Sequence, residues 1–349
     1  MIPALVSLDP LDRFDAIIDA RTPAEFAEDH IPGAINLPVM DNDERARVGT
    51  IYAQESPFAA KKIGAALVAR NVAQHLETHF LSQEKGYRPL VYCWRGGNRS
   101  GAMVTILRAV GWQALQLEGG YKAFRKQVMA ELETLPDAFR FIVVCGPTGS
   151  GKSLFLRTLD EMGAQVLDLE ALAAHKGSLL GALPDTPQPN QKLFESRIWH
   201  ALRGFDPARP VFVESESKKI GALHVPAHLI ERMRASECLR VEADPAVRIA
   251  LLKDEYMHFL ADPARLNRQL DLLTELRGRE RIEHWKSLAL AGDWDTLVTL
   301  LLHEHYDPAY HRSLGSNYPQ ATHGPRLQIT SAEPTALQTQ ATEAIKLFR

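Results

Sequence analysis

The sequence has few cysteines and no excess of positive charge, and these two absences exclude several classes of protein. The three cysteines, Cys93, Cys145 and Cys238, are odd in number and far apart, which argues against a disulfide framework or a zinc site. Forty Lys and Arg against 43 Asp and Glu give a net charge of -3. No chain-wide basic field therefore exists to hold nucleic acid, and any nucleic-acid site must be local.

Long apolar runs are also missing. No run of about 18 apolar residues occurs, and the N-terminus lacks a basic segment followed by an apolar one, so we expect neither membrane spanning nor export. A reducing, cytoplasmic setting is the natural expectation for such a chain. Its 349 residues, 45% of them hydrophobic, exceed one typical domain of roughly 100 to 200 residues, and two globular domains are expected.

Alternating strand and helix patterns predict the α/β class with parallel sheets. In the first half, apolar runs suited to buried strands occur at 15–19, 89–93 and 114–120. In the second half, strand patterns occur at 141–145, 164–169, 211–215, 238–243 and 326–330. We place the domain boundary before the strand at 141–145, which gives domains 1–137 and 138–349. From Pro245 onward the second domain reads as almost entirely helical.

Cys93 stands where a predicted buried strand ends and a turn containing Gly96 and Gly97 leads into a helix. Glycines let successive backbone N–H groups point inward, and the helix N-terminus adds partial positive charge, which together favour a thiolate. Arg95 and Arg99 would strengthen this field and hold an anionic donor. The pattern predicts a nucleophile in an anion cradle, with a small buried core cysteine as the alternative.

The first half resembles the rhodanese family from about Phe14 to Arg125. The residues that carry the resemblance are IIDARTPAEFAEDHIPGAINLP at 17–38, YCWRGGNRS at 92–100 and LEGGYKAF at 117–124. The resemblance implies a rhodanese-like domain in which Cys93 accepts a chalcogen atom as a persulfide, or its selenium counterpart. Asp19, Arg21, Glu25, His30, Pro32 and Gly33 match the family's structural signature. We interpret His30 as a hydrogen-bonded scaffold residue rather than a base.

A phosphate-binding loop follows the strand at 141–145 directly. The segment 146–153 fits G-x-x-x-x-G-K-[ST] and precedes a helical run, which is the context that this P-loop motif requires. Its amides and the helix N-terminus would bind a pyrophosphate, Lys152 would neutralise terminal oxygens, and Ser153 could ligate Mg²⁺. The predicted phosphate-binding residues are Gly146, Thr148, Gly149, Ser150, Gly151, Lys152 and Ser153.

The motif predicts that the loop binds a pyrophosphate group, but it does not establish that the ligand is a nucleotide. The sequence contains no N-K-x-D motif to read a guanine base. Two acidic residues could assist a metal: Glu214 ends the strand at 211–215, and Asp168 ends the strand at 164–169. An equally good interpretation of Asp168 is a helix N-cap.

The helical part combines cations and aromatic residues, which together could contact RNA. The cations are Arg265, Arg268, Arg277, Arg279, Arg281 and Lys286, and the aromatic residues are Tyr256, Trp285, Trp294, Tyr306 and Tyr310. Four carboxylates are interleaved with the cations: Asp271, Glu275, Glu280 and Glu283. A solvated helix face with ion pairs is therefore an equal alternative.

Both motifs in this order resemble the tRNA 2-selenouridine synthase family over nearly the whole chain. Further similarity lies in DLEALAAHKGSLLG at 168–181, QKLFE at 191–195 and VFVESESKKIG at 211–221. The resemblance implies that selenium replaces sulfur in a wobble 2-thiouridine of tRNA. It also implies S-geranylation by geranyl diphosphate, and then selenation from selenophosphate. These two compounds would be co-substrates, with no tightly bound cofactor. Partners would be the tRNA anticodon region and a selenophosphate-supplying enzyme, without DNA or membrane.

Two other functions stay open. One is an ATP-dependent tRNA sulfurtransferase that uses a rhodanese persulfide, in which the P-loop would activate a carbonyl with nucleotide. The other is a nucleotide-gated binding module with a vestigial rhodanese domain.

Overall fold

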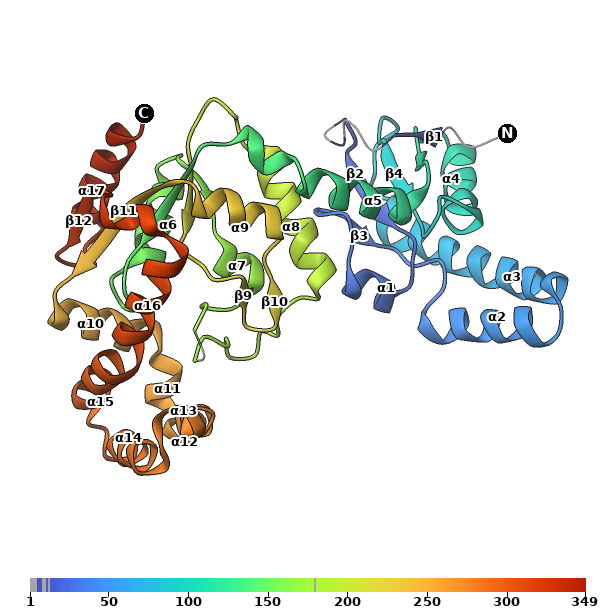
Figure 1. Ribbon diagram of the computed structural model, residues 1–349. Coiled ribbons are helices and arrows are strands. Elements are labelled where there is room, and N and C mark those ends of the chain that lie inside the picture. Colours follow the sequence, from blue (N-terminus) through green and yellow to red (C-terminus); the bar gives the residue numbers. More distant parts are fainter. Residues whose placement is uncertain (1–4, 8–10, 12, 179) are drawn as a thin grey trace. The chain divides into compact units, whose positions relative to one another are not determined.

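The computed structural model describes residues 5–7, 11, 13–178 and 180–349. The chain forms two compact units, each described here by itself (Figure 1). Unit 1 comprises Met1–Glu131 with Glu195–Arg197, and unit 2 comprises Leu132–Phe194 with Ile198–Arg349. The predicted α/β class with parallel sheets and a helical C-terminal part is confirmed. The predicted boundary at 137/138 lies within a short 3-10 turn, η2 (Leu135–Ala138).

Unit 1 is built on a five-stranded parallel sheet in the order β1-β5-β4-β2-β3. The strands are β1 (Leu5–Val6), β2 (Ala16–Asp19), β3 (Ile35–Asn36), β4 (Pro89–Tyr92) and β5 (Leu115–Leu117). The three predicted strands became β2, β4 and β5, which lie side by side. The two-residue strands β1 and β3 extend the edges and were not predicted, because two residues carry no periodicity.

Helices cover this sheet, and the sequence marks where several of them begin. They are α1 (Pro23–Glu28), α2 (Asn42–Gln54), α3 (Pro57–His75), the π-helical η1 (Leu76–Phe80), α4 (Asn98–Val110) and α5 (Gly120–Leu132). Thr22 and Asp41 form capping boxes at the starts of α1 and α2. Val72 of α3 and Met103 and Leu107 of α4 pack against Ile18 and Val91 of the sheet. In Figure 1, α2 and α3 lie side by side as a helical hairpin.

Unit 2 contains a second parallel sheet, in the order β12-β11-β6-β8-β7. Its strands are β6 (Phe141–Cys145), β7 (Gln165–Leu167), β8 (Val211–Glu214), β11 (Glu237–Ala243) and β12 (Arg326–Ile329), and all five were predicted. A separate antiparallel pair consists of β9 (Lys219–Ile220) and β10 (Leu223–His224). The adjoining helices are α6 (Lys152–Glu161), α7 (Leu169–Ala173), α8 (Gln191–Gly204), α9 (Ala227–Arg234) and α17 (Pro334–Leu347). Helices α6 and α17 bury Phe155, Leu159 and Leu337 against Ile142 and Val144 of β6.

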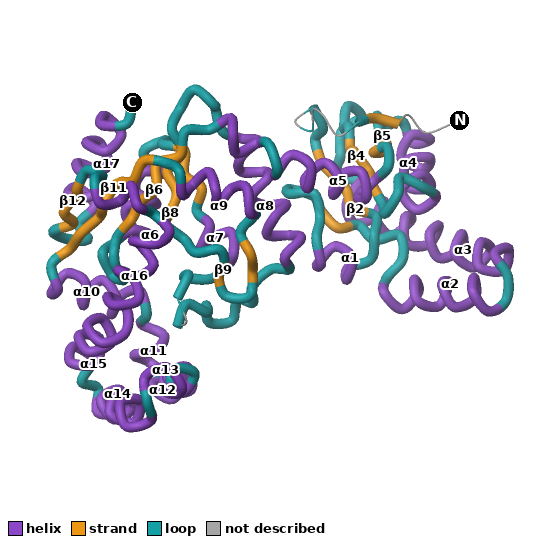
Figure 2. Tube along the Cα trace, in the orientation of Figure 1, coloured by secondary structure: helices purple, strands orange, loops and turns teal. Residues whose placement is uncertain are grey.

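The segment after β11 is helical, as predicted, and has its own core. It comprises α10 (Pro245–Glu255), α11 (Met257–Ala261), α12 (Pro263–Asp271), α13 (Thr274–Arg277), α14 (Arg279–Ala291), α15 (Trp294–Leu301), η3 (Leu302–Tyr306), α16 (Asp307–Asn317) and η4 (Pro319–Thr322). Figure 2 shows these helices in purple beside the strands of unit 2. Their core contains Leu266, Leu270, Trp285 and Leu297. No helix among the described residues is long and apolar enough to cross a membrane.

Candidate functional site

Cys93 follows β4 directly and lies beneath a tight turn. The turn runs over Trp94–Gly97, and α4 begins at Asn98. Gly96 has φ +65°, and Gly120 (φ +58°) approaches so closely that a Cβ there would lie 2.2 Å from the Cys93 carbonyl oxygen. Residues that carry a side chain rarely adopt such positive φ values, so the turn depends on glycine. The predicted strand, turn and helix around Cys93 are confirmed.

The sulfur of Cys93 has a polar partner that sequence reasoning missed. The Ser100 hydroxyl lies 3.1 Å from Sγ, and the Gln116 Nε2 donates to the Ser100 oxygen at 2.8 Å. Because Gln116 fills an acceptor position of that oxygen, the hydroxyl proton is left to donate to the sulfur or to the Gly97 carbonyl, which lies 3.3 Å away. Ser100 lies in the rhodanese-like segment quoted above, whereas nothing in the sequence marks Gln116.

The two predicted arginines differ in their surroundings. Arg95 is exposed on the turn. Arg99 binds Glu25 through two hydrogen bonds, Nη1 to Oε2 at 2.6 Å and Nη2 to Oε1 at 3.2 Å. Burial acts to raise the pKa of Glu25, but the hydrogen bond and charge of Arg99, together with the Thr22 amide and the Arg21 charge, lower that pKa below its usual value. The Glu25 carboxylate therefore offsets part of the positive charge that Arg99 could offer to an anionic ligand. Arg95 is the exposed cation of the turn.

Cys93 is almost completely buried. Only 2% of the residue is exposed, while Arg95 and Gly97 on the adjoining turn are exposed.

A buried ion pair holds the scaffold under Cys93. Arg21 binds both carboxylate oxygens of Asp19, and both residues are almost completely buried. The same guanidinium donates to the Asp29 carbonyl at 2.6 Å and lies 4.0 Å from the centre of the Tyr121 ring. The Tyr121 amide in turn donates to the Cys93 carbonyl at 2.8 Å. A charge pair of this kind is tolerated inside a protein because the two charged groups bind each other through several hydrogen bonds.

His30 has the scaffold role that was predicted for it. Its Nδ1 lies 2.8 Å from the Phe26 carbonyl oxygen, and its ring stacks on Phe26 at 3.9 Å. Both contacts join the turn that follows α1 to Phe26 of that helix. The interpretation as a hydrogen-bonded scaffold residue is confirmed.

The predicted phosphate-binding loop has the expected strand-loop-helix geometry. It joins β6 to α6, and Gly149 (φ +77°) and Gly151 (φ +87°) lie in the left-handed region. The Lys152 ammonium group donates to the loop carbonyls of Gly146 at 2.6 Å and Pro147 at 3.3 Å. A cation and the amino end of a helix thus meet at one loop, the arrangement that binds phosphate groups.

Arg248 braces the loop from the helical segment. Its Nη2 and Nε donate to the Thr148 carbonyl at 2.7 and 3.0 Å, and Asp307 binds the same guanidinium. Arg248 is only 9% exposed. The helical segment therefore fixes the conformation of the phosphate-binding loop, a role that the sequence alone did not reveal.

Three glutamates gather beside Lys152 and Ser153. Glu214, at the end of β8, is 3% exposed, and its Oε1 accepts from the Glu170 amide at 2.7 Å. Its Oε2 has no hydrogen-bond partner among the described residues. The Ser153 hydroxyl donates to Glu170 Oε2 at 3.2 Å. Burial, reinforced by the neighbouring Glu216, raises the pKa of Glu170 to about 8.

Asp168 and Glu214, the two acidic residues predicted to assist a metal, lie in different surroundings. Asp168 is the N-cap of α7, where its Oδ1 accepts from the Ala171 amide at 2.8 Å. Burial raises the pKa of Asp168. Its interpretation as a helix cap is confirmed. Both residues line cavities beside Lys152 and Ser153, Glu214 a cavity of about 340 Å³ and Asp168 a second one of about 570 Å³.

The polar side chains beside the loop fit Mg²⁺ in the way that phosphate-binding proteins hold it. Within residues 5–7, 11, 13–178 and 180–349, no three His, Cys, Asp or Glu side chains form a metal cluster. Mg²⁺ commonly uses only one or two protein carboxylates and takes its other ligands from phosphates and water. The Ser153 hydroxyl and the unpartnered Oε2 of Glu214 are the donors that fit such an ion.

An apolar cavity adjoins the phosphate-binding cavity. The phosphate-binding cavity, of about 340 Å³, is lined by Lys152, Ser153 and the three glutamates. The apolar one lies among α10, α11, α12, α15 and η3, and both are lined by Thr148, Leu252, Tyr256 and Tyr306. Leu266, Trp294 and Leu297 line its apolar side, and its volume is about 60 Å³. A phosphate group and an apolar group could therefore be bound side by side.

In the helical segment, ion pairs and core packing account for some of the cations and aromatic residues for which RNA binding was one of two interpretations. Lys286 pairs with Asp271 and Glu283, and Arg281 pairs with Glu304. Trp285 is fully buried in the core. Tyr256, Tyr306 and Tyr310 line the phosphate-binding cavity. Its aromatic residues are thus used for packing and for the cavity wall, and paired charges occupy part of the surface.

Comparisons with known proteins match both halves of the chain. A family model for the rhodanese-like domain matches residues 7–127, and one for the tRNA 2-selenouridine synthase AAA domain matches residues 139–271. The tRNA 2-selenouridine synthase of Sulfurovum sp. is 32% identical over 335 residues, which cover 86% of this chain and 89% of that protein. The chain belongs to the tRNA 2-selenouridine synthase family. Members of this family are enzymes.

Other members of the tRNA 2-selenouridine synthase family match a smaller share of their length. The Nitrosomonas europaea enzyme is 35% identical over 245 residues, which cover 69% of this chain and 63% of that protein. The chain thus spans less than two thirds of that relative. A crystal structure of the N-terminal domain of a Clostridium difficile 630 protein is 37% identical. The match covers 36% of this chain and 99% of that domain, with a TM-score of 0.33.

Proposed function

We propose that this family member replaces the sulfur of a wobble 2-thiouridine in tRNA by selenium, in two steps at two sites. The first step is S-geranylation by geranyl diphosphate at the phosphate-binding loop, and the second is selenation from selenophosphate at Cys93. The observation that supports this assignment best is the apolar cavity beside the loop, with Thr148, Leu252, Tyr256 and Tyr306 common to both linings. A prenyl diphosphate has the matching halves, one anionic and one apolar.

In the first step the thiocarbonyl sulfur attacks C1 of the geranyl group. The C1–oxygen bond breaks, pyrophosphate leaves, and the uridine N3 proton is lost. Charge develops on the leaving pyrophosphate, so Lys152 and the loop amides would stabilise the transition state. Mg²⁺, when bound by Ser153 and Glu214, would supply further charge neutralisation.

In the second step the Cys93 thiolate attacks C2 of the base. The C2–sulfur bond breaks and the geranyl thiolate leaves, a better leaving group than the sulfur of the unmodified thiocarbonyl. The selenium of selenophosphate then attacks C2, the Cys93 thiolate leaves, and water cleaves the phosphorus–selenium bond and releases phosphate. The Ser100 hydroxyl, 3.1 Å from the Cys93 sulfur, would stabilise the thiolate, and the Arg95 cation on the turn would hold the anionic donor. Delivery to a wobble base implies the tRNA anticodon region and a selenophosphate-supplying enzyme as partners.

The apolar cavity favours this function over an ATP-dependent tRNA sulfurtransferase. Ribose and adenine carry polar atoms, whereas the cavity is lined mainly by leucine and aromatic side chains. The deciding experiment incubates tRNA containing 2-thiouridine with the enzyme and either geranyl diphosphate or ATP, and analyses the nucleosides by mass spectrometry. We expect geranylthiouridine with geranyl diphosphate alone, and 2-selenouridine once selenophosphate is added. A product that forms only with ATP would refute the proposal.

A further inference from the structure

Unit 1 contains a large cavity at the end of its sheet opposite Cys93. Cys93 follows the carboxyl end of β4, whereas Arg88 precedes its amino end and Gln113 precedes β5. Arg108 and Trp112 come from the last turn of α4 and the residues just beyond it. The volume is about 680 Å³. Four residues of strand separate the two places, which corresponds to about 13 Å.

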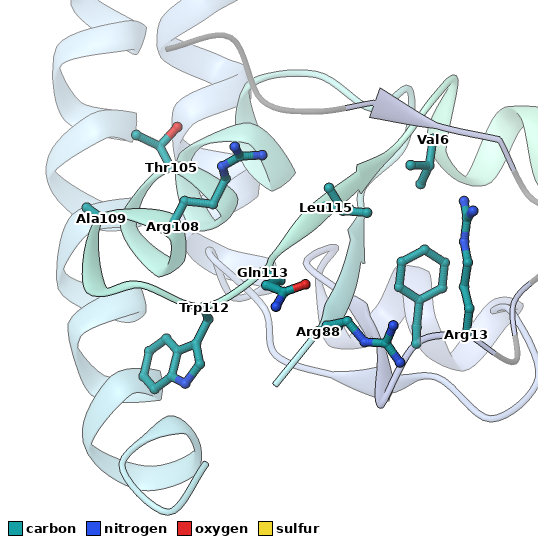
Figure 3. Close-up of a pocket in the computed structure, with 10 residues that line it drawn as sticks. Val6, Arg13, Arg88, Thr105, Arg108, Ala109, Trp112, Gln113 and Leu115 are labelled. Carbon is teal, nitrogen blue, oxygen red and sulfur yellow. The ribbon is translucent and has the colours of Figure 1, made fainter. Parts of the chain in front are cut away.

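Three arginines surround this cavity. Figure 3 shows Arg108 at one side and Arg13 at the other, with Arg88 and Gln113 between them. No Asp or Glu is among the described residues that line it. The chain as a whole carries a net charge of -3, so three guanidinium groups at one cavity are a local departure from the average.

The surroundings leave much of this positive charge available. Asp15 approaches Arg88, but its Oδ2 lies 3.9 Å from Nε, and both side chains are nearly half exposed. Such an exposed pair is weak and offsets little of the charge. Arg13 lies 5.0 Å from the centre of the Phe14 ring, which orients the guanidinium without neutralising it.

We infer that this cavity binds the phosphate backbone of an RNA chain, which for the proposed function is the tRNA substrate. Guanidinium groups bind phosphate oxygens through paired N–H donors, and several of them spread over one cavity match the repeated charges of a backbone. The amide of Gln113 can add a hydrogen bond to a phosphate or ribose oxygen. Unit 1 would thus hold the RNA at a place remote from Cys93.

The test is tRNA binding by the full chain, measured by fluorescence anisotropy over a series of salt concentrations. In the double variant Arg88→Gln/Arg108→Gln, we expect the Kd to rise at least about tenfold at 0.1 M salt. The slope of log K against log salt should become shallower by about 1 to 2, because each lost phosphate contact removes about 0.9. The charge-preserving variant Arg88→Lys/Arg108→Lys should keep most of the affinity.

A matched control separates this site from a general loss of charge. Arg45→Gln/Arg47→Gln removes two exposed cations from α2 of the same unit, outside the cavity, and should leave the Kd and the slope unchanged. Equal effects of both double variants, or none from the Arg88/Arg108 pair, would overturn the inference. Geranylation assayed at saturating tRNA tests the proposed function separately, since the cavity variants should keep the wild-type kcat.

Discussion

The Ser100 hydroxyl lies 3.1 Å from the Cys93 sulfur, and Gln116 donates to the same hydroxyl at 2.8 Å. This arrangement joins the first turn of α4 to the neighbouring strand β5 at the proposed nucleophile. A hydroxyl held in this way can donate to a negatively charged sulfur.

Ser100→Ala should therefore slow the selenation step. A lost hydrogen bond to a charged group costs about 1.5–3 kcal/mol, so we expect about a 10- to 100-fold lower rate of 2-selenouridine formation from geranylated tRNA. Geranylation should keep its wild-type rate. Thr50→Ala, which removes a hydroxyl from α2 of the same unit, is the control. An unchanged selenation rate in Ser100→Ala would show that this hydroxyl has no role.

Lys152→Ala should abolish geranylation. Removing a cation that neutralises a departing pyrophosphate costs several kcal/mol of transition-state stabilisation, so a rate loss of at least about 100-fold is expected. The same variant should still selenate tRNA that was geranylated beforehand, because that step needs no diphosphate. Lys62→Ala on α3 serves as the control. Normal geranyl transfer by Lys152→Ala would refute the assignment of the loop.

Trp294→Ala should change which prenyl chain is accepted. The apolar cavity holds only about 60 Å³, so a ten-carbon chain requires its lining side chains to move. Removing the indole enlarges the cavity, and each additional methylene that fits contributes about 1–3 kcal/mol of discrimination. We expect the ratio of kcat/KM for farnesyl over geranyl diphosphate to rise about tenfold. A ratio equal to that of wild type would place the chain elsewhere.

His305 makes the stability of unit 2 depend on pH. Burial, with the Arg277 cation nearby, lowers the pKa of His305 to about 4, and Arg277 Nε donates to its Nδ1 at 2.9 Å. Between pH 6.5 and 4 the unfolded chain binds a proton at this histidine that the folded chain does not. Its contribution is therefore present above pH 6.5 and is lost as the pH falls to 4, by at most about 1.4 kcal/mol per pH unit.

Thermal unfolding of wild type and His305→Gln, followed between pH 4 and 8, checks this dependence. For a unit of this size each kcal/mol shifts Tm by roughly 2–4 °C. The wild type should lose more stability than His305→Gln on going from pH 7 to pH 4. Parallel Tm curves for the two proteins would contradict the assignment.

The sequence was sufficient to predict the two strands that lead into the turns at Cys93 and at the phosphate-binding loop. The signals for these strands and turns lie close together in the sequence. The apolar runs before Cys93 and Gly146 and the glycines that follow them lie within about ten residues of each other, and both turns have the predicted form. Contacts that depend on the pairing of strands could not be predicted from the sequence. Gln116 reaches Ser100 only because β4 and β5 pair, and Glu170 meets Glu214 only because β7 and β8 pair.

Other features depend on packing between helices that look alike in sequence. Nothing in the sequence distinguishes Arg248 from the other cations of the helical segment. Its guanidinium nevertheless donates a hydrogen bond to the carbonyl of Thr148, 100 residues earlier in the sequence. The sequence did not reveal how deeply Cys93 is buried, because its burial depends on how Gly120 and α5 close over the turn. Periodicity identifies a buried face but not the side chains that meet there.

Cys93→Ser shows whether geranylation and selenation occur at two separate sites. The variant is incubated with tRNA containing 2-thiouridine, geranyl diphosphate and selenophosphate, and the wobble nucleosides are quantified by mass spectrometry. We expect geranylthiouridine to accumulate at the wild-type rate while 2-selenouridine is absent. Formation of 2-selenouridine by Cys93→Ser, or equal loss of both products, would contradict this expectation.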